Sequence, residues 1–265
     1  MTLSLPELGL GTSGNDDPER CAETVARALE AGYRHVDTAQ MYDNEAAVGA
    51  GIARADVPRE EVVLATKIHP DDLAYEDAKR TARESLDRLG VDSVDMLYVH
   101  WPTSAYDPEA TLRAMDELHD EGVCDHVCLS NFTPALLDEA RGLLDAPVAA
   151  HQVECHPRLR QDDLREYARE HGHYLVGYSP LGKGELLEDP VLTDIAGKHD
   201  TTTAAVCLAW ALAGDVLVPI PKGTGDHVEA NLAARDLELD DADLERIEEL
   251  EEKRFIDPDS AAWNR

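Results

Sequence analysis

The feature that most constrains this chain is a regular alternation of short apolar segments with amphipathic helical patterns along its 265 residues. Eight segments have the β-branched, nearly continuous apolar composition of buried strands, namely 8–12, 35–39, 62–67, 94–101, 126–131, 148–154, 174–179 and 216–221. The helical patterns between them are 18–31, 45–55, 75–89, 108–121, 134–144, 162–171, 202–213 and 227–234. Strands buried on both faces belong to parallel sheets covered by helices, and eight such units in about 250 residues favour closure. We therefore predict an α/β fold, a (β/α)8 TIM barrel with eight parallel strands, spanning 1–265 as one domain.

Helix-boundary signals support this prediction. Asp17, Asp107 and Thr133 each precede a proline that opens a helical pattern. Proline loses no hydrogen bond there, because the first N–H groups of a helix have no partner within it. Each of these positions therefore indicates the start of a helix.

Acidic residues outnumber basic ones along the whole chain, with 55 Asp and Glu against 24 Lys and Arg and a net charge of −31. Such a surface repels phosphates, so we expect no nucleic-acid partner and no binding to anionic membranes. The acids dominate stretches that look helical, such as 236–252. With only six lysines and two phenylalanines, this pattern indicates a halophilic protein that stays hydrated in concentrated salt.

Localisation and metal binding follow from what the sequence lacks. It has neither a run of about 18 apolar residues nor a basic segment ahead of an apolar one, so we expect a cytoplasmic protein. Five cysteines at irregular spacing argue against a disulfide framework. Cys124, His126 and Cys128 alternate like buried residues on one strand face, and no second ligand pair matches them. We therefore predict no metal site.

Polar residues gather at the ends of the predicted strands, where the loops of a barrel converge on its active site. Asp37, Tyr42, Lys67 and His100 come from three successive strand ends. An ammonium stabilises a nearby phenolate and lowers its pKa, while an aspartate keeps the lysine charged. A neutral imidazole can orient a carbonyl oxygen. Together these groups indicate proton donation to an oxygen that becomes negative, as in carbonyl reduction.

Each of the four residues also has another interpretation. Asp37 suits a loop cap and Lys67 an exposed strand-end side chain. Tyr42 suits a loop aromatic, and His100 a hydrogen-bonded core histidine. An unrelated barrel enzyme with Lys67 as a Schiff-base nucleophile is a further alternative. Their occurrence at successive strand ends favours the joint catalytic interpretation.

Longer motifs lie at the same strand ends, in the order LGLGT, HVDTAQMYDNEAAVG, LATK, DMLYVHWP, LSNF, HQVECHP, YSPLGKG and IPKG followed by EAN. Over nearly its whole length the chain thus resembles the aldo-keto reductase family, of the 2,5-diketo-gluconate reductase and aldehyde reductase kind. The resemblance implies a barrel that binds NADPH without a Rossmann fold and reduces an aldehyde or ketone by hydride transfer. It also implies a monomer. A non-catalytic NADPH-binding redox sensor is the alternative.

By position, the resemblance implies Tyr42 as general acid, Asp37 and Lys67 as its tuning pair, and His100 as the orienting group. Trp101 would line the substrate pocket with Tyr42 and His100. The implied cofactor-binding residues are Gly11 and Thr12; Ser130, Asn131 and Gln152 at the carboxamide; Tyr178 on the nicotinamide; Ser179, Leu181 and Lys183 over the pyrophosphate; and Lys222, Gly223, Thr224, His227 and Asn231 around the adenosine.

The eighth loop departs from the family pattern, which has Ser or Thr after the lysine and an Arg about six residues later. Gly223 replaces the hydroxyl residue and His227 takes the Arg position. A histidine is only partly charged near neutral pH and cannot make the bidentate contact of an arginine. We therefore predict NADPH as the first cofactor, with NADH also accepted.

Both ends of the chain are short. The N-terminus leaves room only for a reduced β-hairpin at the barrel floor, and Ser13 replaces a common aromatic residue. In the C-terminal tail, Phe255 and Trp263 either cover the pocket mouth or serve in packing. The identity of the carbonyl substrate therefore stays open.

Overall fold

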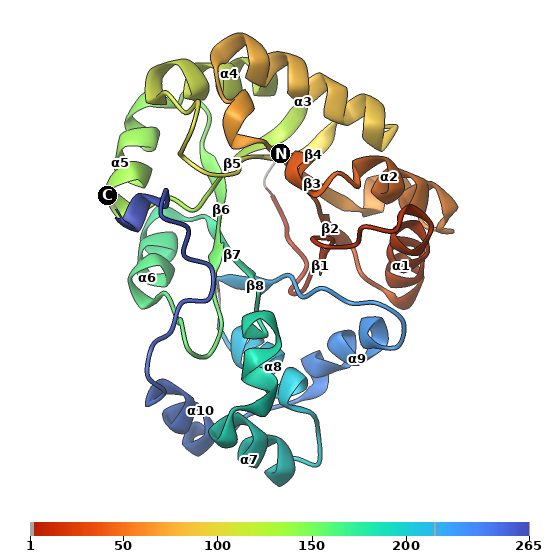
Figure 1. Ribbon diagram of the computed structural model, residues 1–265, viewed down its shortest axis with the longest axis vertical. Coiled ribbons are helices and arrows are strands. Elements are labelled where there is room, and N and C mark those ends of the chain that lie inside the picture. Colours follow the sequence, from red (N-terminus) through yellow and green to blue (C-terminus); the bar gives the residue numbers. More distant parts are fainter. Residues whose placement is uncertain (1–2, 215, 265) are drawn as a thin grey trace.

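A computed structural model describes residues 3–214 and 216–264 (Figure 1). Eight parallel strands form one sheet in sequence order, from β1 to β8. The sheet closes on itself, since the N–H of Gly11 donates a 3.0 Å hydrogen bond to the carbonyl oxygen of Pro221 beyond the last strand. The predicted (β/α)8 barrel is confirmed.

The predicted elements all occur, the helices within one residue of their expected bounds and the strands within two. The strands are β1 Leu10–Gly11, β2 His35–Asp37, β3 Val63–Ile68, β4 Val94–Val99, β5 Cys124–Ser130, β6 Val148–Glu154, β7 Tyr174–Tyr178 and β8 Leu217–Pro219. The helices are α1 Pro18–Ala31, α2 Glu45–Arg54, α3 Tyr75–Leu89, α4 Pro108–Asp120, α5 Pro134–Leu143, α6 Asp162–His171, α7 Pro190–Lys198, α8 Thr203–Leu212, α9 His227–Ala233 and α10 Asp241–Glu248. Most strands end before the predicted residue, because the backbone leaves the sheet to turn over the barrel mouth.

The segment between 179 and 202 contains helices that the sequence analysis missed. They are the short 3-10 helix η4 (Gly182–Glu188) and α7. The start of α7 carries the same signal as other helices here, because Asp189 precedes a proline and accepts the N–H of Val191 at 2.9 Å. This signal could have identified the helix.

The acidic stretch 236–252 is helical over only half its length, so that prediction was too long. Residues 237–240 are not helical, and α10 begins only after them. Asp240 caps this helix by accepting the N–H of Asp243 at 3.0 Å. A cap inside the acidic stretch therefore sets the helix boundary.

Side chains from alternate strand positions fill the barrel interior, as the two-residue period of a strand requires. The interior cluster consists of Ala65, Met96, Tyr98, Cys128, Ala150, Val176 and Ile220. Leu3 and Leu5 pack against this cluster. Residues 3–9 form no strand, so the reduced hairpin is not found in the described N-terminal segment.

All five cysteines are buried and free. Over 3–214 and 216–264, no group of three His, Cys, Asp or Glu side chains is arranged to hold a metal ion. No helix in that part of the chain is long and apolar enough to cross a membrane.

The close contact between α2 and α3 depends on Gly49, where an added Cβ would overlap the backbone oxygen of Leu89. We predict that Gly49→Ala lowers the free energy of unfolding by about 1–3 kcal/mol through overpacking. Gly197→Ala is the matched control, because an added Cβ in α7 meets open space; it should stabilise the protein by up to about 1 kcal/mol. Urea denaturation of both variants measures the difference, and equal stabilities would contradict this packing.

Candidate active site

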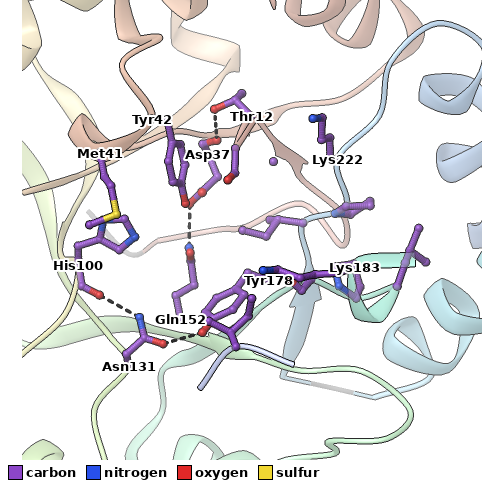
Figure 2. A pocket seen from close by; sticks show the side chains of 18 of the residues that line it. Thr12, Asp37, Met41, Tyr42, His100, Asn131, Gln152, Tyr178, Lys183 and Lys222 are labelled. Carbon is purple, nitrogen blue, oxygen red and sulfur yellow. Dashed lines mark hydrogen bonds between the residues drawn. The ribbon is translucent and has the colours of Figure 1, made fainter. Parts of the chain in front are cut away.

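The strand ends surround a cavity of about 550 Å³ (Figure 2). This volume lies in the range of cofactor and small-molecule sites. The predicted site residues that line it are Gly11, Thr12, Asp37, Tyr42, His100, Trp101, Asn131, Gln152, Tyr178, Ser179, Leu181, Lys183 and Lys222.

Asp37 and Lys67 form a buried ion pair at the base of this cavity, with side chains 2% and 0% exposed. Lys67 Nζ donates to Asp37 Oδ1 and, at 2.8 Å, to the carbonyl oxygen of Thr38. Gln152 Nε2 donates to the other Asp37 carboxylate oxygen at 2.8 Å. Burial alone lowers the pKa of Lys67, but the charge of Asp37 raises it, and the net shift is upward. A buried, charged Lys67 fits neither the exposed strand-end interpretation nor a free amine for Schiff-base chemistry.

Tyr42 lies above this ion pair, with its ring centroid 5.0 Å from Lys67 Nζ. Burial raises the pKa of Tyr42, the charge of Lys67 lowers it and that of Asp37 raises it, with a net upward shift. Lys67 lowers the pKa of Tyr42 as the sequence analysis expected, but burial and the Asp37 charge outweigh this effect. The phenol therefore keeps its proton at neutral pH.

The loop that carries Tyr42, the 3-10 turn Gln40–Tyr42, is fastened by two buried residues that the sequence analysis missed. Asn44 Nδ2 donates to the carbonyl oxygen of Thr12 at 2.9 Å. The Glu45 carboxylate accepts the hydroxyl of Thr66. Adjacent Asn and Glu at the start of a helix were the available signal, since buried polar groups need partners.

His100 follows β4 directly and points toward Tyr42. The two ring centroids are 5.8 Å apart, with the planes at 85°. Burial and the charge of Lys67 hold the pKa of His100 well below its usual range. The Nδ1 atom of His100 is buried and has no hydrogen-bond partner among the described residues. The imidazole is therefore neutral.

Asn131 connects the ends of several strands (Figure 2). It adopts a left-handed conformation, with φ of 64°. Its Nδ2 atom donates to the carbonyl oxygen of His100 at 2.9 Å and to Ser130 Oγ at 3.0 Å. Its Oδ1 atom accepts the hydroxyl of Tyr178 at 2.9 Å, and Ser130 Oγ donates to the carbonyl oxygen of Gln152 at 3.0 Å. This network fixes the aromatic ring of Tyr178 as a flat wall of the cavity.

The donors that line the cavity fit a nicotinamide dinucleotide. Asn131 and Gln152 supply amide groups near the aromatic ring of Tyr178, as a carboxamide and a planar ring require. Lys183 and Lys222 supply positive charge farther along the cavity, where phosphates need it.

Glycines allow close backbone approach in the same region. A Cβ added at Gly11 would lie 2.7 Å from the carbonyl oxygen of Ile220, and one at Gly223 would lie 3.3 Å from Val228 Cα. A larger residue at either position would push the first strand or the eighth loop outward, away from the rest of the site.

Only part of the predicted adenosine subsite comes together. Asn231 is buried and its Nδ2 lies 3.4 Å from the carbonyl oxygen of Lys222, whereas His227 is exposed at the start of α9. Four residues of the predicted subsite do not line the cavity, namely Gly223, Thr224, His227 and Asn231. The guanidinium of Arg20 on α1 donates to Thr224 Oγ1 at 3.4 Å. The sequence analysis missed this cation because 204 positions separate it from Thr224.

The C-terminal tail takes both roles that the sequence left open. Trp263 packs against Trp101, with ring centroids 5.7 Å apart, and Ile256 lines the cavity. Phe255 instead packs against His156, with ring centroids 5.1 Å apart. The tail thus forms one side of the pocket.

Known proteins are similar to this chain in sequence and in architecture. Residues 7–252 match the sequence model of the Aldo/keto reductase family. Methylglyoxal reductase DkgB of Escherichia coli O157:H7 is 37% identical over 98% of both chains. MGS-M4, an aldo-keto reductase enzyme from a deep-sea metagenome library, superposes with a TM-score of 0.90 at 31% identity, covering 97% of this chain and 95% of that one. Bombyx mori aldo-keto reductase in complex with NADP has a TM-score of 0.89 at 28% identity, covering 97% and 93%. The chain belongs to the aldo/keto reductase family.

Proposed function

We propose that Tyr42 is the general acid with which this protein reduces a small aldehyde or ketone to the alcohol. Membership of the family makes the chain a nicotinamide-dependent carbonyl oxidoreductase. The observation that carries the proposal is the position of the Tyr42 phenol above the buried Asp37–Lys67 pair, where burial raises the pKa of Tyr42. The alternative of a non-catalytic redox sensor is not supported, because relatives across the whole chain are named as reductases.

When bound, a nicotinamide cofactor would supply hydride to the carbonyl carbon. As negative charge develops on the carbonyl oxygen, Tyr42 transfers its proton to that atom. Lys67 stabilises the phenolate that results, and Asp37 keeps Lys67 charged. The neutral imidazole of His100 orients the carbonyl oxygen by a hydrogen bond, and Trp101 forms the adjoining wall of the substrate pocket.

NADPH is the proposed first cofactor, with NADH also accepted. Lys222 and Arg20 supply positive charge near the eighth loop, and a relative of the same fold binds NADP. The proposed holding residues are Gly11, Thr12, Ser130, Asn131, Gln152, Tyr178, Ser179, Leu181, Lys183, Lys222, Gly223, Thr224, His227 and Asn231. Exposed His227 in place of an arginine favours weak discrimination.

The proposed setting is the cytoplasm of a salt-adapted cell, with residues 1–265 acting as one domain and a monomer, and without a nucleic-acid partner. The support is a net charge of −31. Dense carboxylates repel one another at low ionic strength, and salt screens that repulsion. Stability and cofactor affinity should therefore persist in molar KCl.

Replacing the acid tests the proposed chemistry. Tyr42→Phe should lower kcat for 4-nitrobenzaldehyde reduction by about a hundredfold or more, because the ring stays while the proton is lost. NADPH affinity, measured by quenching of tryptophan fluorescence, should stay nearly unchanged. Tyr106→Phe is the matched control, since its hydroxyl is buried outside the cavity and has no partner among the described residues. Full activity in Tyr42→Phe would remove Tyr42 as the acid.

His227→Arg tests the adenosine subsite. A permanent guanidinium should lower the Kd of NADPH by about fivefold or more through charge-assisted contacts with the 2′-phosphate, with little change for NADH. The control His171→Arg makes the same charge change at an exposed position of α6 outside the cavity. Cofactor titrations at 0.1 and 2 M KCl also test the proposed salt adaptation. Equal effects on both cofactors would place His227 away from the phosphate, and loss of binding only at 2 M would contradict the halophilic setting.

A further inference from the structure

Glu154, the last residue of β6, is a buried carboxylate that the proposed chemistry does not use. Its side chain is 0% exposed. Oε1 accepts the backbone N–H of Phe255 at 2.8 Å, and Oε2 accepts that of Ile256 at 3.0 Å. His156 Nε2 lies 3.1 Å from Oε1. Both carboxylate oxygens thus accept hydrogen bonds from residues that lie 101 and 102 positions later in the chain.

The two residues held by Glu154 have different surroundings: Phe255 packs within the protein, whereas Ile256 lines the cavity. Phe255 packs against His156, and its ring leaves no room for a Cβ at Gly182 in the loop after β7. Ile256 lines the cavity, to which Trp101 and Leu181 also contribute. A shift of the backbone at these positions would therefore move a cavity wall.

The rest of the tail continues from this anchor over the substrate side of the site. The guanidinium of Arg254 lies 4.1 Å from the ring centroid of Trp263. The ring of Trp263 in turn packs against Trp101. The anchored segment thus precedes the aromatic contact between Trp263 and Trp101, a residue that lines the cavity.

We propose that Glu154 is a positioning residue for the substrate pocket, where its buried carboxylate holds the backbone of Phe255 and Ile256 and thereby fixes the wall formed by the tail. The inference rests on the proposed function for the meaning of the pocket. A buried carboxylate is costly unless hydrogen bonds compensate it, and the two N–H donors of the tail supply them. The charge and the wall therefore stabilise each other.

Glu154→Gln removes this anchor at nearly constant volume. The amide keeps one acceptor oxygen but turns an NH2 group toward the second backbone N–H, so donor meets donor. We expect hydrogen exchange of the Phe255 and Ile256 amides to accelerate by about tenfold or more. KM for the aromatic substrate 4-nitrobenzaldehyde should rise by about threefold or more as the wall loosens, while kcat for a small aldehyde and the Kd of NADPH stay within about twofold of the original values.

The control is Glu185→Gln, which removes another carboxylate that contacts the same tail, in this case from η4. Glu185 pairs with Lys253 Nζ at 2.7 Å, with both side chains more than half exposed. Such surface pairs contribute little, so amide exchange and KM should stay unchanged in this variant.

The proposal is overturned if Glu154→Gln leaves amide exchange and KM as they were, or if kcat for every substrate and NADPH affinity fall together. Should Glu154→Gln fail to fold, Glu154→Asp decides. A carboxylate withdrawn by one methylene should give faster exchange of the two amides than in the original protein, and unchanged rates overturn the proposal. Amide exchange needs no turnover. A protein that reduces no carbonyl would therefore refute the proposed function and leave the test of Glu154 intact.

Discussion

The ion pair between Asp37 and Lys67 places two opposite charges inside the barrel, where removal from water is costly. That cost is offset only because the remaining hydrogen-bonding capacity is also used, by the carbonyl oxygen of Thr38 and the amide of Gln152. Asp37, Lys67 and Gln152 come from β2, β3 and β6, so the pair requires distant strands to keep their register. The position and protonation state of Tyr42 depend on this arrangement.

Buried carboxylates have a common role in this acidic protein. Asp37 holds Lys67 beneath the cavity, and Glu45 ties the start of α2 to Thr66 of β3 and to Arg88 of α3. Glu154 ties the C-terminal tail to the end of β6. Each of the three joins a segment near the pocket to a strand, whereas most of the 55 acidic residues face solvent and determine the net charge. Burial distinguishes these three carboxylates from exposed ones such as Glu19, which also pairs with an arginine.

The sequence was sufficient to predict the barrel, because most strands are apolar on both faces and most helices have one buried stripe, and both patterns are local. It also located Asp37, Tyr42, Lys67 and His100, because parallel strands bring their ends to one rim. It could not predict the roles of Asn44, Arg20 or Glu154, whose partners lie far along the chain. Nor could the sequence predict the net pKa shift of Tyr42, since burial is a property of the assembled site. The missed helix α7 is different, because its Asp-Pro start was visible in the sequence.

The central claim is that Tyr42 and Lys67 act as one proton-donating unit, and a double-mutant cycle on the rate of hydride transfer tests it most directly. Single-turnover rates from NADPH-loaded enzyme would be measured for Tyr42→Phe, Lys67→Met and the double variant. If Lys67 acts through the phenol, the double variant should transfer hydride within about threefold of the rate of Tyr42→Phe alone. If the two losses multiply, the residues act independently, and the account of Lys67 as the partner of the Tyr42 acid is contradicted.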